Sequence, residues 1–459
     1  MTVAPIEAPA FLTLQHLSDD EEQRRLRLIS QLRRGQRANK RQEAFYEGSI
    51  RARDLGIAIP PHLLDAVEAV AAAPEIVVDV VDERMDWRGW APDASLGLDT
   101  VYDENHLGIE VGQGTLDALI CGLAYLSVGT GDEGEPDVLV KAESPSRMTA
   151  TWDPRLRRAT DALSELYDDA GRLYGWRTYL PDETTTVERI GGRLVVTDRD
   201  DHGRGRVPVA VLLNRPRASR TTGRSEITRA VRSLTESMMR TLLGMEIARE
   251  FYGAPQRYLM GADESMFVDE SGKPVGQWAA IIGRMLMAPR DENDDLPVPG
   301  QFSASSPQPF TELLKTYSQL ISAATGIPAS HLGFASDNPA SADAIERADA
   351  RLDKRAIRRQ RQYDLGLVEL GQLAVLWRDG SLPDLDKVKS LWVDPSAPSP
   401  GARADRAGKM VAAKVLSPEW DFTLEQYGLS DEEIARVRKE RAANPIPVEP
   451  APAPAPAGA

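Results

Sequence analysis

The amino-acid sequence predicts an α+β fold, because periodic helical segments flank a region of short alternating strands. Residues 341–380 repeat apolar side chains at three- and four-residue steps, the spacing that places them on one helix face. Residues 221–252 and 310–325 show the same period. Between residues 138 and 214, short apolar runs alternate with polar residues and are separated by Gly- and Asp-rich turns, which is typical of hairpins.

Length and composition bound what the protein can be. Its 459 residues can form two or three domains with buried cores, and the mean hydropathy of −0.36 indicates a soluble, folded chain. No apolar run approaches the ~20 residues of a membrane span, and we expect no secretory signal. We therefore expect cytosolic synthesis and no membrane partner. The single cysteine, Cys121, excludes an internal disulfide framework, and its apolar neighbours predict a buried, unreactive thiol.

The charge balance also narrows the possible functions. The formal net charge is −15 at pH 7, from 55 Lys and Arg residues and 70 Asp and Glu residues. This balance argues against a protein that binds nucleic acid by broad neutralisation of phosphates. It permits a conduit through which DNA slides under weak attraction, and it also suits solubility alone.

The helix expected after residue 341 has three kinds of surface. Ser341 suits the N-cap, and Asp343 places a negative charge in the first turn. The apolar face comprises Ile345, Ala348, Leu352, Ala356, Tyr363, Leu367, Leu370, Ala374 and Trp377. The basic face comprises Arg347, Arg351, Lys354, Arg358 and Arg361, and the acidic flank comprises Glu346, Asp349, Asp353 and Asp364. The pattern fits both a solvated surface helix and a helix packed between identical neighbours in a ring.

Upstream of this helix, the sequence predicts a mixed α/β region. Residues 19–54 form a helix that is dense in basic residues, and residues 105–129 form a helix followed by a strand. The Val-rich run at residues 73–90 predicts a β-rich segment that ends in a turn. The further strands are residues 138–140, 148–152, 173–180, 185–190, 193–197 and 208–214, with hairpin loops at 191–192 and 200–205.

The second half is predicted to be mainly helical. Ser225 suits the cap of a helix that ends before Gly253, and a compact, turn-rich module at residues 256–309 separates it from the helix at 310–325. The elements expected after Gly380 are a strand-like KVKSLWVD, helices at residues 402–415, 418–427 and about 430–443, and a disordered Pro- and Ala-rich tail at 444–459.

No constellation of residues predicts catalysis. The candidate metal ligands are Asp198, Asp200, Asp201 and His202. They lie in a Gly-flanked hairpin, where Asp is common for reasons of turn geometry. A second acidic run, which suits a solvated loop tip, comprises Asp291, Glu292, Asp294 and Asp295. Gly129–Gly134 lacks the ending of a phosphate loop, and no GxSxG or HExxH motif occurs. We expect no enzymatic activity, no cofactor and no metal.

Two motifs resemble a known family. GRSEI at Gly223–Ile227 and LGFASDNPASADAI at Leu332–Ile345 are similar, in sequence and order, to segments of the portal proteins of long-tailed bacteriophages. The resemblance spans roughly residues 45–380 and implies the portal fold, assembled as a ring. The implied boundaries are residues 1–222 for the mixed α/β N-terminal wing region, 223–253 for the first stem helix, 254–308 for the small α/β clip, 309–327 for the second stem helix, 328–380 for the tunnel loop and long tunnel helix, 381–445 for crown-like helices and 446–459 for the disordered tail.

The resemblance also implies a function and its partners. The chain would form a homo-oligomeric ring, typically a dodecamer, at one capsid vertex of the virion. Double-stranded DNA would be packaged and ejected through the ring. Its protein partners would be the terminase large subunit, the head–tail adaptor, and the major capsid and scaffolding proteins. ATP hydrolysis would belong to the terminase.

Three sets of residues would make the implied contacts. The tunnel loop that lines the DNA channel comprises Phe334, Ala335, Ser336, Asp337, Asn338, Pro339 and Ala340. The tunnel-helix residues that contact either phosphates or the next subunit are Arg347, Arg351, Lys354 and Arg358. The clip residues for docking are Asp291, Glu292, Asp294 and Asp295. Contact between subunits suits the helix better, because a ring needs complementary faces.

Two alternatives remain open from the residues alone. Another structural head protein or a monomeric adaptor would share the helical pattern but would not close into a ring. A metal-dependent nuclease that uses Asp198–His202 would cut DNA in the presence of Mg²⁺, and Asp200→Ala would abolish that activity.

Overall fold

The computed structural model describes residues 17–51, 69–91, 96–220, 222–253, 257–260, 298–301, 306–333, 342–384, 387–396 and 400–443. The chain divides into two compact units, Met1–Val393 and Asp394–Ala459, which are described separately. None of the helices in the described ranges has the length and apolar composition that a membrane crossing requires.

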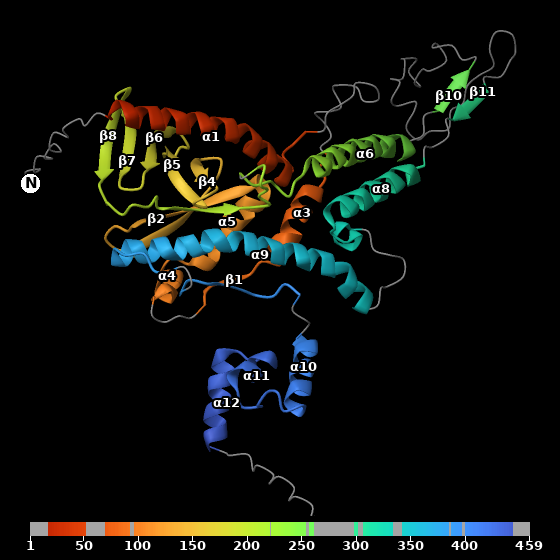
Figure 1. Cartoon of the computed structure of the whole chain (residues 1–459). Coiled ribbons are helices and arrows are strands. Elements are labelled where there is room, and N and C mark those ends of the chain that lie inside the picture. The colour runs from red at the N-terminus through yellow and green to blue at the C-terminus, as the bar shows by residue number, and fades with distance from the viewer. Residues whose placement is uncertain are drawn as a thin grey trace, which may run out of the picture. The chain divides into compact units, whose positions relative to one another are not determined.

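The first unit is layered around two antiparallel sheets (Figure 1). The strands are β2 (Leu123–Thr130), β3 (Val138–Glu143), β4 (Met148–Asp153), β5 (Arg158–Tyr167), β6 (Leu173–Tyr179), β7 (Thr184–Ile190), β8 (Arg193–Asp200) and β9 (Val209–Leu213). One sheet has the order β4-β5-β6-β7-β8 and the other has the order β3-β2-β9. The α+β fold class predicted from the sequence is confirmed.

Helices cover the outer faces of both sheets. α1 (Asp19–Tyr46) lies on the five-stranded sheet, where its Leu28 and Leu32 pack with Leu163 of β5. α5 (Leu107–Cys121) and α9 (Ala342–Asp379) cover the three-stranded sheet. Along β2, Tyr125 faces the core between the sheets and Leu126 faces the helices, because successive strand residues point to opposite sides.

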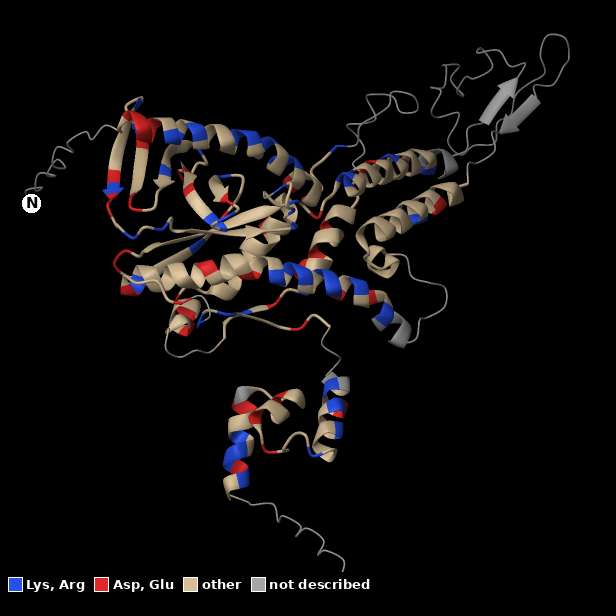
Figure 2. Cartoon of the chain, in the orientation of Figure 1, with Lys and Arg blue, Asp and Glu red and all other residues tan. Residues whose placement is uncertain are grey.

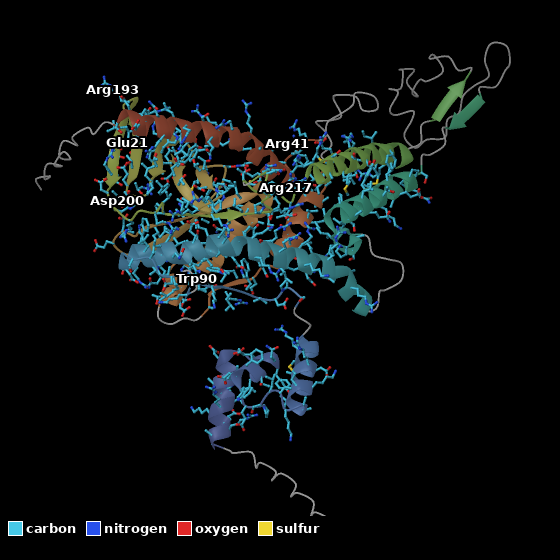
Figure 3. All side chains as sticks on the ribbon, in the orientation of Figure 1. Glu21, Arg41, Trp90, Arg193, Asp200 and Arg217 are labelled. Carbon is cyan, nitrogen blue, oxygen red and sulfur yellow. The ribbon has the colours of Figure 1, made fainter. Side chains whose placement is uncertain are left out.

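The predicted apolar stripe of α9 is confirmed over most of its length. The stripe residues without exposed surface are Leu352, Ala356, Tyr363, Leu367, Leu370 and Ala374. Ala348 is exposed, so the buried stripe begins later than the sequence predicts. Gly366 lets the helix lie directly on β9, since an added Cβ would stand 2.5 Å from the carbonyl oxygen of Val211. Trp90 lies beneath the helix (Figure 3), and its indole N–H donates to the carbonyl of Leu367 at 2.9 Å.

The prediction of a β-rich segment at residues 73–90 is wrong for its first part. Residues Ala73–Asp82 form helix α3, and only Trp87–Trp90 form a strand, β1. Pro74 lies in the first turn of the helix, where its missing N–H does no harm. Val77, Val78 and Val81 are fully buried at helical spacing, so tertiary packing outweighs the β preference of valine.

Strand β1 pairs antiparallel with β12 (Ser390–Trp392), which confirms the strand expected in KVKSLWVD. The pairing places Trp87 opposite Trp392. The short helix α4 (Leu98–Glu104) lies by the C-terminal end of α9, where Arg378 donates to the carbonyl of Gly97. The short helix η2 (Ala329–Leu332) lies by α8 and α3.

α6 (Arg229–Gly253) and α8 (Gln308–Thr325) lie side by side, as Figure 1 shows. Beyond them, β10 (Arg257–Met260) pairs antiparallel with β11 (Val298–Gln301). Both predicted helices are confirmed, but Ser225 is not the cap of α6, because the helix begins four residues later. The Ser225 hydroxyl accepts from the N–H of Ile227 at 2.9 Å, and the Thr228 hydroxyl accepts from the N–H of Val231.

The second unit contains α10 (Pro400–Ala412), α11 (Asp421–Gln426) and α12 (Asp431–Ala443). The predicted capping box is confirmed: the Ser430 N–H donates to the Glu433 carboxylate at 2.8 Å, and the Glu433 N–H donates back to the Ser430 hydroxyl. The Pro- and Ala-rich tail at 444–459 lies outside the described residues.

Candidate functional site

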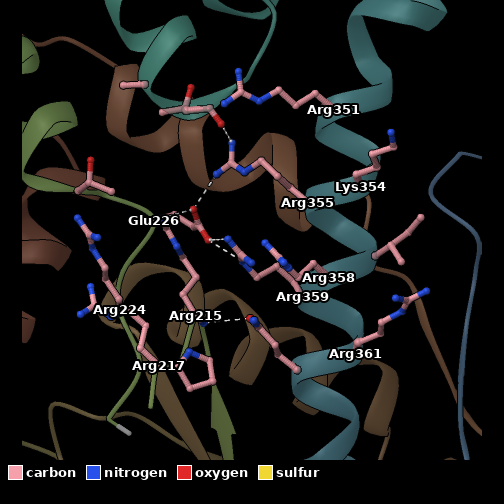
Figure 4. A pocket seen from close by; sticks show the side chains of 16 residues that line it. Arg215, Arg217, Arg224, Glu226, Arg351, Lys354, Arg355, Arg358, Arg359 and Arg361 are labelled. Atoms are coloured by element: carbon pink, nitrogen blue, oxygen red, sulfur yellow. Dashed lines mark hydrogen bonds and ion pairs between the residues drawn. The ribbon is translucent and has the colours of Figure 1, made fainter. Parts of the chain in front are cut away.

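The N-terminal half of α9 and the loop between β9 and α6 enclose an open pocket of about 1060 Å³ (Figure 4). The cationic side chains that line it are Arg215, Arg217, Arg224, Arg351, Lys354, Arg355, Arg358, Arg359 and Arg361. Among the described lining residues, Glu226 supplies the one carboxylate. In Figure 2, Lys and Arg gather on this half of α9, whereas the other half is mostly uncharged.

Glu226 is the centre of the pocket's ion-pair network. Its side chain is completely buried, and its carboxylate accepts from Arg355 and Arg359 of α9 at 2.7 Å and from Arg215 at 3.2 Å. The amide of Asn214 approaches the same carboxylate at 3.3 Å. The network therefore joins the loop before α6 to the middle of α9.

The GRSEI motif explains how the loop presents this carboxylate. Gly223 has φ +68°, and an added Cβ would stand 1.9 Å from the carbonyl oxygen of Gly122, so no other residue fits there. The Glu226 N–H donates to the carbonyl of Leu119 in α5 at 2.9 Å. Ile227 follows and is fully buried in the main core. The motif is thus a tight turn that anchors Glu226 between α5 and α9.

Electrostatics around Glu226 are strongly perturbed. Burial by itself raises the pKa of its carboxyl, but the charges of Arg359, Arg355 and Arg215 outweigh burial and hold the pKa below its usual value. The pKa of Arg215 is lowered by burial and by the neighbouring arginines, against the attraction of Glu226. The carboxylate is therefore ionised at neutral pH, and it does not balance the cations around it.

Six of the nine cations are left without a carboxylate. They are Arg217, Arg224, Arg351, Lys354, Arg358 and Arg361, all exposed, and none forms an ion pair within the described part of the chain. Arg351, Lys354 and Arg358 were predicted from the sequence as contact residues, and the structure places them together on the pocket wall (Figure 4). Arg347 is exposed on the same stripe but does not line the pocket.

Two residues on the acidic flank of α9, Asp349 and Asp353, form ion pairs with residues of the same chain. Arg84, which follows α3, contacts Asp349 at 3.4 Å and Asp353 at 3.2 Å. The imidazole of His331 lies 3.2 Å from the Asp349 carboxylate. Since these contacts already engage Asp349, it is a weaker partner for a neighbouring subunit than its position in the sequence suggests.

Two groups of predicted site residues lie outside the described residues, namely the tunnel loop at residues 334–340 and the acidic run at residues 291–295.

Of the candidate metal ligands, His202 packs its ring against Trp377 with centroids 5.1 Å apart, and its Nδ1 accepts from the Arg204 N–H. In the described ranges, no three His, Cys, Asp or Glu side chains gather in a way that could hold a metal ion.

The Cys121 thiol is half-buried rather than fully buried and points toward Glu43, whose carboxylate lies 3.8 Å from its Sγ. Burial, with the nearby carboxylates of Glu43 and Asp117, raises the pKa of this thiol. A raised pKa keeps the thiol protonated and unreactive, in agreement with the sequence-based expectation.

Sequence reasoning missed the roles of Arg355 and Arg359. They stand four residues apart, so they share one helix face, and that face is turned inward toward Glu226. The isolated Glu in GRSEI, among many arginines, is the signal that points to them.

A second pocket of about 700 Å³ shares Arg215, Arg217 and Arg224 with the first and extends along α1, so the basic surface continues beyond α9.

Known proteins share the sequence pattern of this chain. The family model described as “Phage portal protein, SPP1 Gp6-like” matches residues 76–445. The portal protein of Mycobacterium phage D29 is 34% identical over 382 residues, which cover 80% of this chain and 77% of that protein. The portal protein of Mycobacterium phage L5 is 32% identical over the same shares. The chain belongs to the phage portal protein family, whose members are structural components of the virion.

Solved structures also resemble the chain. A chain from the neck of a native GTA particle, computed with C12 symmetry, aligns with a TM-score of 0.42 and 14% identity, covering 88% of this chain and 98% of that chain. A chain from the neck of an empty GTA particle, computed with C6 symmetry, aligns with a TM-score of 0.40 and 16% identity over 84% and 98% of the two chains.

Proposed function

We propose that copies of this chain close into a ring at one capsid vertex, and that double-stranded DNA is packaged and ejected through the ring. The family match over residues 76–445 carries this proposal. Ion pairs at Glu226 join the GRSEI turn to the predicted tunnel helix, so the helix that follows the proposed tunnel loop in the sequence is held to the rest of its unit.

The proposal assigns a role to each part of the chain. Residues 1–222 and the helix α9 form the wing, and α6 and α8 form the stem. The clip lies between them in the sequence, with β10 and β11 at its base, and it docks the terminase and later the head–tail adaptor. The tunnel loop at residues 334–340 faces the channel, and the helices of the second unit form a crown. The chain itself catalyses no reaction, and ATP hydrolysis belongs to the terminase.

Oligomeric state tests the proposal. Native mass spectrometry and negative-stain electron microscopy of the purified full chain should show a closed ring of identical copies with a central hole. A chain that stays monomeric at high concentration and within the virion contradicts the proposal.

Charge reversal then separates the two roles considered for the basic face of α9. Arg351→Glu should reduce ring assembly if the residue contacts a neighbouring subunit. Unchanged assembly with impaired DNA packaging would instead assign Arg351 to contacts with phosphates. Arg347→Glu, on the same stripe but outside the pocket, is the matched comparison.

A further inference from the structure

The pocket around Glu226 carries more positive charge than the carboxylates among its described lining residues balance. Eight arginines and Lys354 stand against one described carboxylate, an excess of 9 − 1 = 8 positive charges. Like charges that share a recess repel one another, and the repulsion is larger where side chains are partly withdrawn from water. An arrangement of this kind is stabilised by an anionic partner that enters the recess.

The rest of the same chain has the matching charge. The whole chain carries −15, so all residues other than these pocket residues carry −15 − 8 = −23. The turn between β2 and β3 is one source, since its Asp132, Glu133, Glu135 and Asp137 are exposed and form no ion pair with any described cation. In a head-to-tail ring each copy presents both faces of the contact, so complementary surfaces on one chain are what such a ring requires.

The shape of the site favours a protein carboxylate over a nucleic-acid duplex. The cations line a recess of about 1060 Å³ that reaches the buried Glu226, so it admits individual side chains, whereas the phosphates of a duplex are spread over a much wider surface. A side chain on a turn or a helix end can enter such a recess. Arginine forks bind carboxylates through two parallel hydrogen bonds, which adds specificity to the charge attraction.

We propose that this pocket is a socket that receives carboxylate side chains from a second copy of the chain and thereby joins neighbouring subunits. The inference rests on the proposed ring. Within the socket, the arginines bonded to Glu226 are held rigid by their own chain. The six exposed cations, Lys354 among them, are the ones available to the neighbour.

Lys354 permits a direct test, because it is the one lysine among the described pocket residues. A water-soluble carbodiimide joins an amine to a carboxylate that touches it, without a spacer. Rings assembled from an equal mixture of ¹⁴N- and ¹⁵N-labelled full-length chains would be treated with this reagent, digested and analysed by mass spectrometry. We expect a Lys354 peptide linked to an Asp or Glu peptide, with mixed-isotope pairs showing that the two come from different copies. Lys354→Arg keeps the charge and removes the amine, so the same linked peptide must disappear.

Assembly provides a second measurement. The double substitution Lys354→Gln and Arg358→Gln should raise the concentration needed for half-maximal ring assembly by roughly tenfold or more. The control is the double substitution Arg155→Gln and Arg157→Gln, which also removes two exposed cations but between β4 and β5, and it should change that concentration less. The difference should shrink at high salt, where exposed charge pairs are screened.

The possible results distinguish a failure of the socket proposal from a failure of the ring proposal. If rings form but Lys354 links to nothing, or only within its own copy, the socket is wrong and the ring stands. The socket is also wrong if Lys354 forms no link between copies and added DNA duplex protects it from chemical modification. That result would assign the pocket to contacts with phosphates. If no ring forms, the proposed function and the socket both fail.

Discussion

Replacing Glu226 by glutamine should strongly destabilise the first unit. The substitution keeps the shape of the side chain but removes the charge that three arginines share at 2.7–3.2 Å. At an effective dielectric constant of about 20, each pair of unit charges roughly 4 Å apart interacts by about 4 kcal/mol, and desolvation offsets part of that. Measured losses on breaking a buried ion-pair network are about 3–5 kcal/mol, so we expect a loss of about 3 kcal/mol in the free energy of unfolding.

Urea unfolding of the full chain, followed by tryptophan fluorescence, measures this loss, since Trp87 and Trp90 are buried in the same unit. Asp86→Asn is the matched control. It also removes a carboxylate that contacts an arginine at 2.7 Å, but that pair, Asp86 with Arg88, is exposed. Exposed pairs contribute about 0–1 kcal/mol. A loss below about 1 kcal/mol for Glu226→Gln would refute the reasoning.

A double variant tests whether Glu226 and Arg359 stabilise the fold as a pair. Without the carboxylate, Arg359 is a buried cation that faces other cations, so Arg359→Gln should destabilise much less in the Glu226→Gln background than in the parent. We expect a coupling energy of about 1–3 kcal/mol. Equal effects of Arg359→Gln in the two backgrounds would show that the pair is not coupled.

The pH dependence follows from the lowered pKa of Glu226. A carboxyl with a lowered pKa in the folded state stabilises fully above the pKa of an unfolded glutamate, about 4.3. That contribution is lost as the pH falls through the lower folded pKa. The parent should therefore lose stability in this acid range, and the difference between parent and Glu226→Gln should narrow there.

Three further predictions concern other parts of the first unit. Burial and nearby carboxylates raise the pKa of Asp82 to about 6, so its ionisation destabilises the fold as the pH rises from about 4 to 6. Asp82→Asn should raise the free energy of unfolding by about 1–3 kcal/mol at pH 7 and by much less at pH 4, measured by urea titration at both pH values. Gly366→Ala should lower the free energy of unfolding by about 1–3 kcal/mol, because the added Cβ would overlap the carbonyl of Val211. Gly112→Ala on α5 should raise it by about 0.5–1 kcal/mol, because nothing lies near the added Cβ. Thermal melting of the two variants measures both changes. Iodoacetamide should label Cys121 slowly in the native chain and rapidly in urea, and equal rates would contradict a thiol with a raised pKa.

Periodic sequence patterns predicted the elements whose burial follows a simple repeat. α8, α9 and most strands of both sheets were predicted within a few residues, and α5 was predicted as a helix followed by a strand. α1 and α6 were also predicted, but α1 ends eight residues before the predicted end and α6 begins eight residues after the predicted start. β5 was missed because α1 covers it and polar side chains occupy buried positions on it. Asp161 and Ser164 are both nearly inaccessible, and Asp161 pairs with Arg27 of α1. This packing hides the alternation on which strand prediction depends.

The candidate site was predicted only in part, for a related reason. Exposure on a helix follows from its periodicity, so Arg351, Lys354 and Arg358 could be assigned to one open face. The partners of Arg355 and Arg359 could not, because Glu226 stands 129 residues before the first of them and only the tertiary fold brings the three together. A buried charge network of this kind leaves no period in the sequence.

The side-by-side pairing of α6 and α8 determines how the chain can tolerate changes in length between them. The two helices and the β10–β11 pair bring Met260 and Val298 together. The segment between these two residues therefore leaves the rest of the protein and returns to it at nearly the same point. A longer segment at such a position costs little, because each doubling of its length adds only about 0.6 kcal/mol to the entropic cost of closing the loop. A longer or shorter insert can therefore be accommodated at this point while the layered body and its arginine network stay as they are.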